Sequence, residues 1–171
     1  VPMPYLVADI GGGSTELAAG TADVESACSV DVGCVRLSER HFGTDPPRPA
    51  QIEAARTVIE AALDEAVRLV PISAIGSLVG LAGSVTTVAA IHLGLTKYDP
   101  VAIHRARVPA SAAREISDRL LVASHAERAA IPAMHPGRVD VIAAGALVLR
   151  SVIDRSGVDE VIASETDILD G

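Results

Sequence analysis

The sequence predicts an α/β fold in which helices pack on a mixed β-sheet. Nearly half of the residues (49%) are apolar, but the chain has only one Phe, two Tyr and no Trp. The core must therefore be built from Val, Ile, Leu and Ala, which let helices and sheets pack closely. Strand patterns come first along the chain, and helix and strand patterns then alternate. A length of 171 residues is enough for one domain with a sizeable core.

The first third of the chain predicts a β-meander. "YLVADI" at 5–10 is an apolar run of strand length, while "TELAAGT" at 15–21 and "ESACSVDVG" at 25–33 alternate between apolar and polar residues. Three glycines, 11–13, then form the first hairpin turn. Later strands are predicted at 78–83, 101–108 and 158–164.

Apolar positions at helical spacing predict the helices. The clearest signal runs from Pro49 to Val70, where Ile59 and Ala66 lie on an apolar stripe and Glu60 lies off it. "SHAE" at 124–127 has the pattern of a capping box. Further helices are predicted at 34–42, 84–93, 111–122 and 137–157, the last ended by Gly157.

Composition argues against several classes of function. A formal net charge of −8 is unfavourable for a nucleic-acid or anionic-membrane surface. Cys28 and Cys34 have no zinc-site spacing, and we interpret them as reduced thiols of a cytosolic protein. The five His are scattered, without a metal-binding pattern. The apolar run at 141–149 is far shorter than the roughly 20 residues that cross a bilayer.

The glycine turn is the first candidate site. "DIGGGSTEL" at 9–17 lacks the third glycine of a dinucleotide fingerprint, and the chain has no Walker A motif. Successive N–H groups of such a turn can form an anion nest, to which Ser14 and Thr15 add hydroxyl donors. Asp9 and Glu16 would repel a phosphate there unless Mg²⁺ lay between them. The alternative is an ordinary glycine-rich hairpin with surface acids.

The stretch "LAGSVTT" at 81–87 is the second candidate site. A strand is predicted to end at Gly83 and a helix to begin at Ser84. A helix N-terminus offers unpaired N–H groups and partial positive charge to an anion, and Ser84, Thr86 and Thr87 supply hydroxyls. The alternative is that Ser84 only caps the helix.

These two loops, in this order, resemble the second half of the sugar kinase/Hsp70/actin superfamily. Within that superfamily, "DIGGGSTEL", "VGCVRLSERHF", "GLAGSVTTVAAI" and "HPGRVDVIAAGALVL" resemble the Ppx/GppA phosphatase family. The resemblance extends over 5–164 in the order and spacing of the family. The preference for Arg, with Lys97 as the one lysine, resembles actinobacterial members.

The resemblance implies a fold and an activity. It implies a ribonuclease H-like lobe with a mixed five-stranded sheet and helices packed on it, with 1–171 as the C-terminal lobe of a two-lobed cytoplasmic enzyme. Family members release terminal phosphate from inorganic polyphosphate, or the 5′ γ-phosphate from guanosine pentaphosphate, with Mg²⁺ as cofactor. These compounds are the expected partners, and no nucleic-acid or membrane partner is expected.

The resemblance also implies roles for individual residues. Asp9 and Glu16 are expected to be catalytic, as carboxylates that hold Mg²⁺ or orient water. The phosphate-binding residues are expected to be Gly11, Gly12, Gly13, Ser14, Thr15, Gly83, Ser84, Thr86 and Arg138. For Arg138 the alternative is a surface arginine at a helix start. Arg36 is interpreted as stabilising the fold.

One departure from the family affects the expected activity. The family's N-terminal lobe, with an earlier phosphate loop and the glutamate believed to act as general base, has no counterpart here. We therefore expect the chain alone to be inactive or nearly so, and its exposed cleft face to permit a homodimer. Two alternatives stay open: an ATP-dependent kinase or ATPase of the same superfamily, and a non-catalytic module that binds phosphate or a phosphorylated alarmone.

Overall fold

A computed structural model describes residues 2–166 of the chain. Its strands are β1 (Tyr5–Ile10), β2 (Thr15–Gly20), β3 (Val24–Val30), β4 (Ser77–Leu81), β5 (Arg107–Pro109) and β6 (Glu160–Ala163). Its helices are α1 (Cys34–His41), α2 (Pro49–Ala66), α3 (Ala82–His92), α4 (Pro100–Ile103), α5 (Ala110–Val122), α6 (His125–Ala129) and α7 (Ile142–Ser156), with a 3₁₀ turn at Pro136–Arg138.

The strands form one mixed sheet in the order β3-β2-β1-β4-β6-β5. β1, β2 and β3 pair antiparallel, as the predicted meander requires. β4 is parallel to both β1 and β6. The implied five-stranded sheet is therefore wrong by one strand, because the three-residue β5 adds to the edge antiparallel to β6.

The strand predicted at 101–108 is mostly wrong. The carboxylate of Asp99 accepts hydrogen bonds from the N–H groups of Val101 and Ala102, at 3.0 and 3.2 Å. This N-cap opens the short helix α4 and delays the strand until Arg107. β3 and β4 also end earlier than predicted, at Val30 and Leu81.

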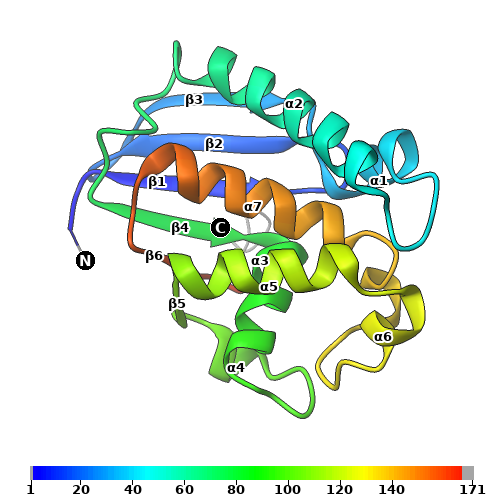
Figure 1. Ribbon diagram of the computed structural model, residues 1–171. Helices are drawn as coiled ribbons and strands as arrows, with labels where there is room; N and C mark the ends of the chain where they lie inside the picture. The colour runs from blue at the N-terminus through cyan, green and yellow to red at the C-terminus, as the bar shows by residue number, and fades with distance from the viewer. Residues whose placement is uncertain (1, 167–171) are drawn as a thin grey trace.

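The helices cover one face of the sheet and enclose the core. Figure 1 shows α2, α7 and α5 side by side in front of the strands. Along β1, every second side chain is buried and the others are half-buried. α7 contacts α1, α2, α3 and α5, and every residue from Ile142 to Leu149 is buried. The hydrophobic layer between sheet and helices is thus organised around α7.

Most helix predictions are confirmed, with two shifted starts. The capping box joins Ser124 and Glu127, and Gly157 ends α7 in the left-handed conformation at φ 72°. α7 begins at Ile142, after the 3₁₀ turn, whereas the predicted helix began at 137. α3 begins at Ala82, two residues before the predicted start.

Close packing of α7 against α3 requires a glycine. A Cβ placed on Gly145 would lie 2.1 Å from the Ser84 hydroxyl oxygen and 3.3 Å from the Cβ of Cys34. Because the contact atoms belong to buried side chains of α3 and α1, they have little room to move.

We predict that Gly145→Ala lowers the free energy of unfolding by about 2 kcal/mol, since overpacking a tight core costs about 1–3 kcal/mol. Urea denaturation measures this. Gly43→Ala is the control, because its new methyl would meet only the end of the Gln51 side chain, at 3.2 Å. Equal stabilities of the two variants would contradict the packing argument.

Candidate functional site

Strand pairing brings the two predicted loops to the same edge of the sheet. Asp9 of β1 lies opposite Leu81 of β4 in the parallel register. The glycine turn follows β1 directly, and the start of α3 at Ala82–Gly83, which is called the second loop below, follows β4 directly. The carboxyl ends of parallel strands are where α/β sheets bind ligands. The structure therefore brings together two segments that are far apart in the sequence.

The N-terminus of α1 holds the glycine turn from behind. The N–H of Cys34 donates to the Gly11 carbonyl at 3.0 Å. The N–H groups of Val35 and Arg36 both donate to the Gly12 carbonyl, at 2.9 and 3.0 Å. These bonds use donors that a helix N-terminus otherwise leaves unpaired. The turn carbonyls consequently point towards α1.

Two amide groups of the same turn are left available, whereas the N–H of Gly11, which was expected to bind phosphate, donates to the Ser14 carbonyl at 3.0 Å. Within the described part of the chain, no hydrogen bond uses the N–H of Gly12 or Gly13. Both glycines line an open hollow of about 490 Å³ together with Arg36 and Arg40. Arg36 also lies 3.5 Å from the carboxylate of Asp31, an ion pair at the surface. Glu39 adds a carboxylate to the same hollow, so the unpaired N–H groups, rather than a surplus of positive side chains, are what would favour an anion there.

The glycines in this region have different reasons for being glycine. None of the three turn glycines has a positive φ. A Cβ on Gly13 would meet only the Arg36 guanidinium, at an ordinary 3.6 Å. A Cβ on Gly33 would lie 2.5 Å from the backbone of Gly12. Gly33, which sequence reasoning missed, is required for packing of the turn, whereas packing within the chain does not require glycine at position 13.

Asp9 and Glu16 are direct cross-strand neighbours. They pair in the antiparallel register of β1 and β2, so their side chains share a face of the sheet. Both are half-buried. The Oε1 atom of Glu16 accepts hydrogen bonds from the hydroxyls of Ser14, at 2.6 Å, and Ser29, at 2.9 Å. Ser29 was not predicted, although it lies opposite Glu16 in the β2–β3 register.

The carboxylate pair suits a magnesium ion that is shared with a ligand. Mg²⁺ is usually held by one or two carboxylates, waters and substrate phosphates. Among residues 2–166 no group of three or more His, Cys, Asp or Glu side chains could hold a metal. Asp9 and Glu16 are two carboxylates at the sheet edge where the glycine turn begins and ends, and they could hold such an ion.

Thr15 lies on the opposite face of the hairpin from Glu16. Its side chain is completely buried, and its hydroxyl donates to the Val32 carbonyl at 2.6 Å. This bond fixes the chain between β3 and α1. The structure thus uses the hydroxyl internally and separates it from the carboxylate pair.

The second loop has an unusual backbone conformation and lies against an arginine. Ala82 has φ 67°, a left-handed conformation that is unfavourable for a residue with a Cβ. Gly83 lies directly beneath the Arg138 guanidinium, since a Cβ there would be 2.1 Å from its Cζ atom. Arg138 is therefore brought to the loop, but it also lies half-buried in the 3₁₀ turn before α7, so its role in phosphate binding stays a prediction.

Two predicted hydroxyls of this loop face the protein interior. Ser84 is completely buried against Gly145, and its hydroxyl has no hydrogen-bond partner within 2–166. The capping alternative is wrong, because α3 has no side-chain cap at its N-terminus. Thr86 is buried too and donates to the Tyr98 hydroxyl at 2.7 Å.

Tyr98 connects the second loop with the residues after β6. Its hydroxyl donates to the carboxylate of Glu165 and accepts from Thr86. Burial and the hydrogen bond to Glu165 raise the pKa of Tyr98 to about 12, while the Thr86 bond acts in the opposite direction. Tyr98 and Glu165 were not predicted, because nothing in their local sequence indicates the contact.

Cys28 and Cys34 are free thiols, as predicted. Over the part of the chain that is described, no helix is both long and apolar enough to cross a membrane.

The fold and the site define the class of protein. A glycine-rich hairpin and a loop opening a helix meet at the carboxyl ends of adjacent parallel strands, in a 3-2-1-4 sheet. This is a lobe of the actin-like, ribonuclease H-like class. The chain belongs to the Ppx/GppA phosphatase family, whose sequence model matches residues 3–171.

Relatives and solved structures agree with this assignment. The chain is 44% identical over 172 residues to Exopolyphosphatase 2 of Mycobacterium tuberculosis, covering 98% of this chain and 54% of that protein. It superposes on an exopolyphosphatase-like protein with a TM-score of 0.95 at 36% identity, covering 99% of this chain and 58% of the other. For the Ppx/GppA protein of Aquifex aeolicus the TM-score is 0.87 at 27% identity, covering 95% and 52%. The chain therefore spans about half the length of these relatives.

We predict that Gly33→Ala destabilises the protein by about 2 kcal/mol or more, because the new methyl meets backbone that must shift. Gly13→Ala is the matched variant, and its free energy of unfolding should change by less than about 0.5 kcal/mol. Chemical denaturation distinguishes them. A strongly destabilised Gly13→Ala variant would contradict the distinction between the two glycines.

We predict that one of the two tyrosines ionises late in an alkaline titration followed by tyrosinate absorbance. The raised pKa of Tyr98 means that its stabilising contribution is present below the ordinary value of 10.0 and is lost towards about 12. Tyr98→Phe should remove the late component. If the late component persists in that variant, the assignment to Tyr98 is wrong.

Proposed function

We propose that this chain supplies one side of a cleft that hydrolyses the terminal phosphoanhydride of inorganic polyphosphate with the help of Mg²⁺. The observation that carries the proposal is that the paired Asp9 and Glu16 flank the glycine turn in which the N–H groups of Gly12 and Gly13 are unpaired. Carboxylates and anion-binding amides at one place are compatible when a cation lies between carboxylate and phosphate.

Each group at the sheet edge has a role in this proposal. Asp9 and Glu16 would hold Mg²⁺, which supplies charge neutralisation for the phosphate oxygens. Ser14 and Ser29 orient Glu16 through hydrogen bonds to its Oε1 atom. The N–H groups of Gly12 and Gly13 would bind phosphate oxygens. No other chemistry is required of the turn, because phosphoryl transfer depends mainly on positioning and electrostatics.

Arg138 would bind the phosphate chain from the side of the second loop. Its guanidinium lies against Gly83, and the register of β1 and β4 places that loop next to the glycine turn. Guanidinium groups bind phosphate oxygens in a bidentate manner. The buried hydroxyls of Thr15, Ser84 and Thr86 would support the loops from within.

We expect the chain alone to bind the substrate and to hydrolyse it very slowly. Attack on phosphorus needs an oriented water and charge stabilisation on both sides. The N-terminal lobe of the family, which would carry the general base, is the expected partner.

We favour polyphosphate over guanosine pentaphosphate because two relatives, Exopolyphosphatase 2 of M. tuberculosis and the exopolyphosphatase-like protein of known structure, are named for it. Both substrates end in a phosphoanhydride that the same two loops could hold. Their comparison is therefore part of the experiment.

We predict that the chain binds tripolyphosphate in the presence of Mg²⁺, and that Glu16→Gln weakens the binding roughly tenfold or more. Gly13→Ala should also weaken it, because a methyl group would separate the phosphate from the amides. Isothermal titration calorimetry with and without EDTA measures both effects. Glu25→Gln is the control, since this exposed carboxylate of β3 accepts a hydrogen bond from Thr21 away from the turn.

Hydrolysis is tested in a two-lobed protein in which this chain replaces the matching half of Exopolyphosphatase 2. Phosphate release from polyphosphate that depends on Asp9 and Glu16 supports the proposal. Faster turnover of ATP would favour the kinase or ATPase alternative, and tight binding without any hydrolysis would favour the binding module. If the chain alone were as active as the two-lobed protein, the proposal that it supplies only one side of the cleft would be wrong.

A further inference from the structure

A buried arginine connects three segments behind the candidate site. Arg128 of α6 has only 5% of its side chain exposed. Its Nε atom donates to the Val139 carbonyl at 2.9 Å, and its Nη1 atom to the Ala123 carbonyl at 2.5 Å. Its Nη2 atom donates to the carboxylate of Asp45 at 2.6 Å. A buried guanidinium is tolerated only with such a full set of partners.

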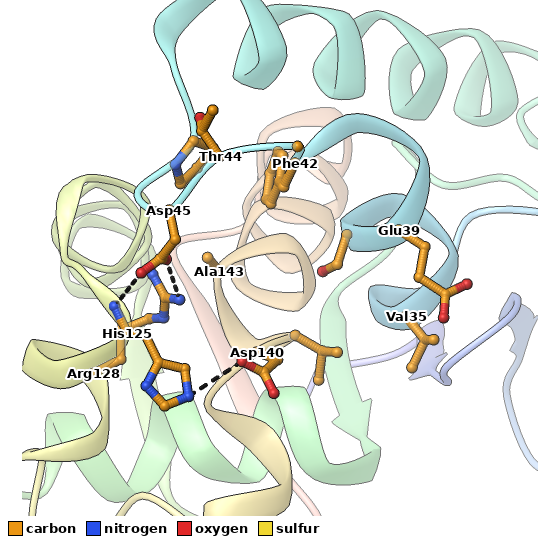
Figure 2. A pocket seen from close by; sticks show the side chains of 13 residues that line it. Val35, Glu39, Phe42, Thr44, Asp45, His125, Arg128, Asp140 and Ala143 are labelled. Carbon is orange, nitrogen blue, oxygen red and sulfur yellow. Dashed lines mark hydrogen bonds and ion pairs between the residues drawn. The ribbon is translucent and has the colours of Figure 1, made fainter.

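Asp45 binds α6 from the connection between α1 and α2. Besides Arg128, its carboxylate accepts the N–H of His125 at 2.6 Å, as Figure 2 shows. Burial opposes ionisation of Asp45, but the hydrogen bonds from His125 and Arg128 outweigh it and lower the pKa of Asp45. The pair is therefore ionised at neutral pH, and its Coulomb attraction adds to the hydrogen bonds.

The segment that carries Arg138 is held to the same helix. Val139, which accepts from Arg128, is the next residue after Arg138. Asp140 lies 3.3 Å from the His125 imidazole, an interaction that is also drawn in Figure 2. Pro136 and Gly137 on the other side are exposed. The bonds to α6 therefore anchor the segment that carries Arg138, whose own turn is closed by the Arg138 N–H donating to the His135 carbonyl at 2.9 Å.

The other end of the connection leads to the glycine turn. α1 holds the carbonyls of Gly11 and Gly12 at its N-terminus. Its C-terminus at His41 is followed by the short stretch that contains Asp45. The Arg128–Asp45 pair thus connects α1, which holds the glycine turn, with the segment that carries Arg138.

We propose that Arg128 and Asp45 form a positioning pair that sets the spacing between the glycine turn and Arg138. The inference rests on the proposed function, because it assumes that Arg138 and the turn bind the same phosphate chain. Neither residue of the pair touches the substrate. Misplacing a binding group by about 1 Å is enough to weaken its contribution strongly.

The experiment measures binding of tripolyphosphate and Mg²⁺ to the chain by calorimetry. Arg128→Met and Asp45→Asn should each weaken binding roughly tenfold. In an Arg138→Ala background the same substitutions should have little further effect, because the group that they position is gone. Arg155→Met is the matched control. Arg155 of α7 pairs with Glu60 and Asp64 at 2.7 and 2.6 Å, remote from the two loops.

A second measurement needs no ligand. The N–H of Val141 donates to the Arg138 carbonyl at 3.0 Å. Its hydrogen exchange should accelerate in Arg128→Met and Asp45→Asn, and stay unchanged in Arg155→Met.

The outcomes separate the two proposals. Unchanged Val141 exchange overturns the inference whatever the binding result. Binding losses that are equal with and without Arg138 also overturn it, because they indicate a general structural role. Failure of the unaltered chain to bind tripolyphosphate contradicts the proposed function, while accelerated exchange would still support the anchoring of Arg138.

Discussion

Parallel pairing of β1 with β4 is the constraint on which the candidate site depends. It places Asp9 opposite Leu81, so that the glycine turn and the loop at Gly83 leave the sheet side by side. Antiparallel pairing of β1 with β2 then adds Glu16 next to Asp9. These three strands therefore bring the carboxylates and backbone amides of the glycine turn next to a loop about 70 residues further along the chain, and Arg138 reaches that loop from a third segment. The hydrophobic layer around α7 holds the helices against these strands.

The polar groups of the site divide between inward and outward roles. The carbonyls of Gly11 and Gly12 accept from α1, while no hydrogen bond of the described residues uses the N–H groups of Gly12 and Gly13. Thr15, Ser84 and Thr86 turn their side chains into the protein. Ordered backbone with few flexible side chains suits the binding of phosphate, because little conformational entropy is lost on binding. The acidic chain would thus bind a polyanion through local groups.

The sequence could predict the meander, the two loops and the two acids that flank the glycine turn, whereas the direct pairing of these acids came from the strand register. Alternation along 15–21 and the glycines at 11–13 carry that information locally. The burial of Ser84 could not be predicted, because it depends on Gly145, which lies 61 positions later. The missing side chain of Gly145 lets α3 pack closely against α7. The contact of Ser29 with Glu16 follows from the strand register, and that of Tyr98 with Thr86 from tertiary packing, so neither could be predicted locally. The residues 101–108 were misassigned because the Asp99 cap outweighs their strand pattern.

A crystal structure of the chain grown with tripolyphosphate and Mg²⁺ tests the central claim most directly. The account predicts a metal ion between the carboxylates of Asp9 and Glu16 and a phosphate group. That phosphate should accept hydrogen bonds from the amides of Gly12 and Gly13, and the anion should extend towards Arg138. An anion bound elsewhere, such as beside Arg105 and Arg107 in the hollow that also contains Tyr5, would contradict the assignment of the site.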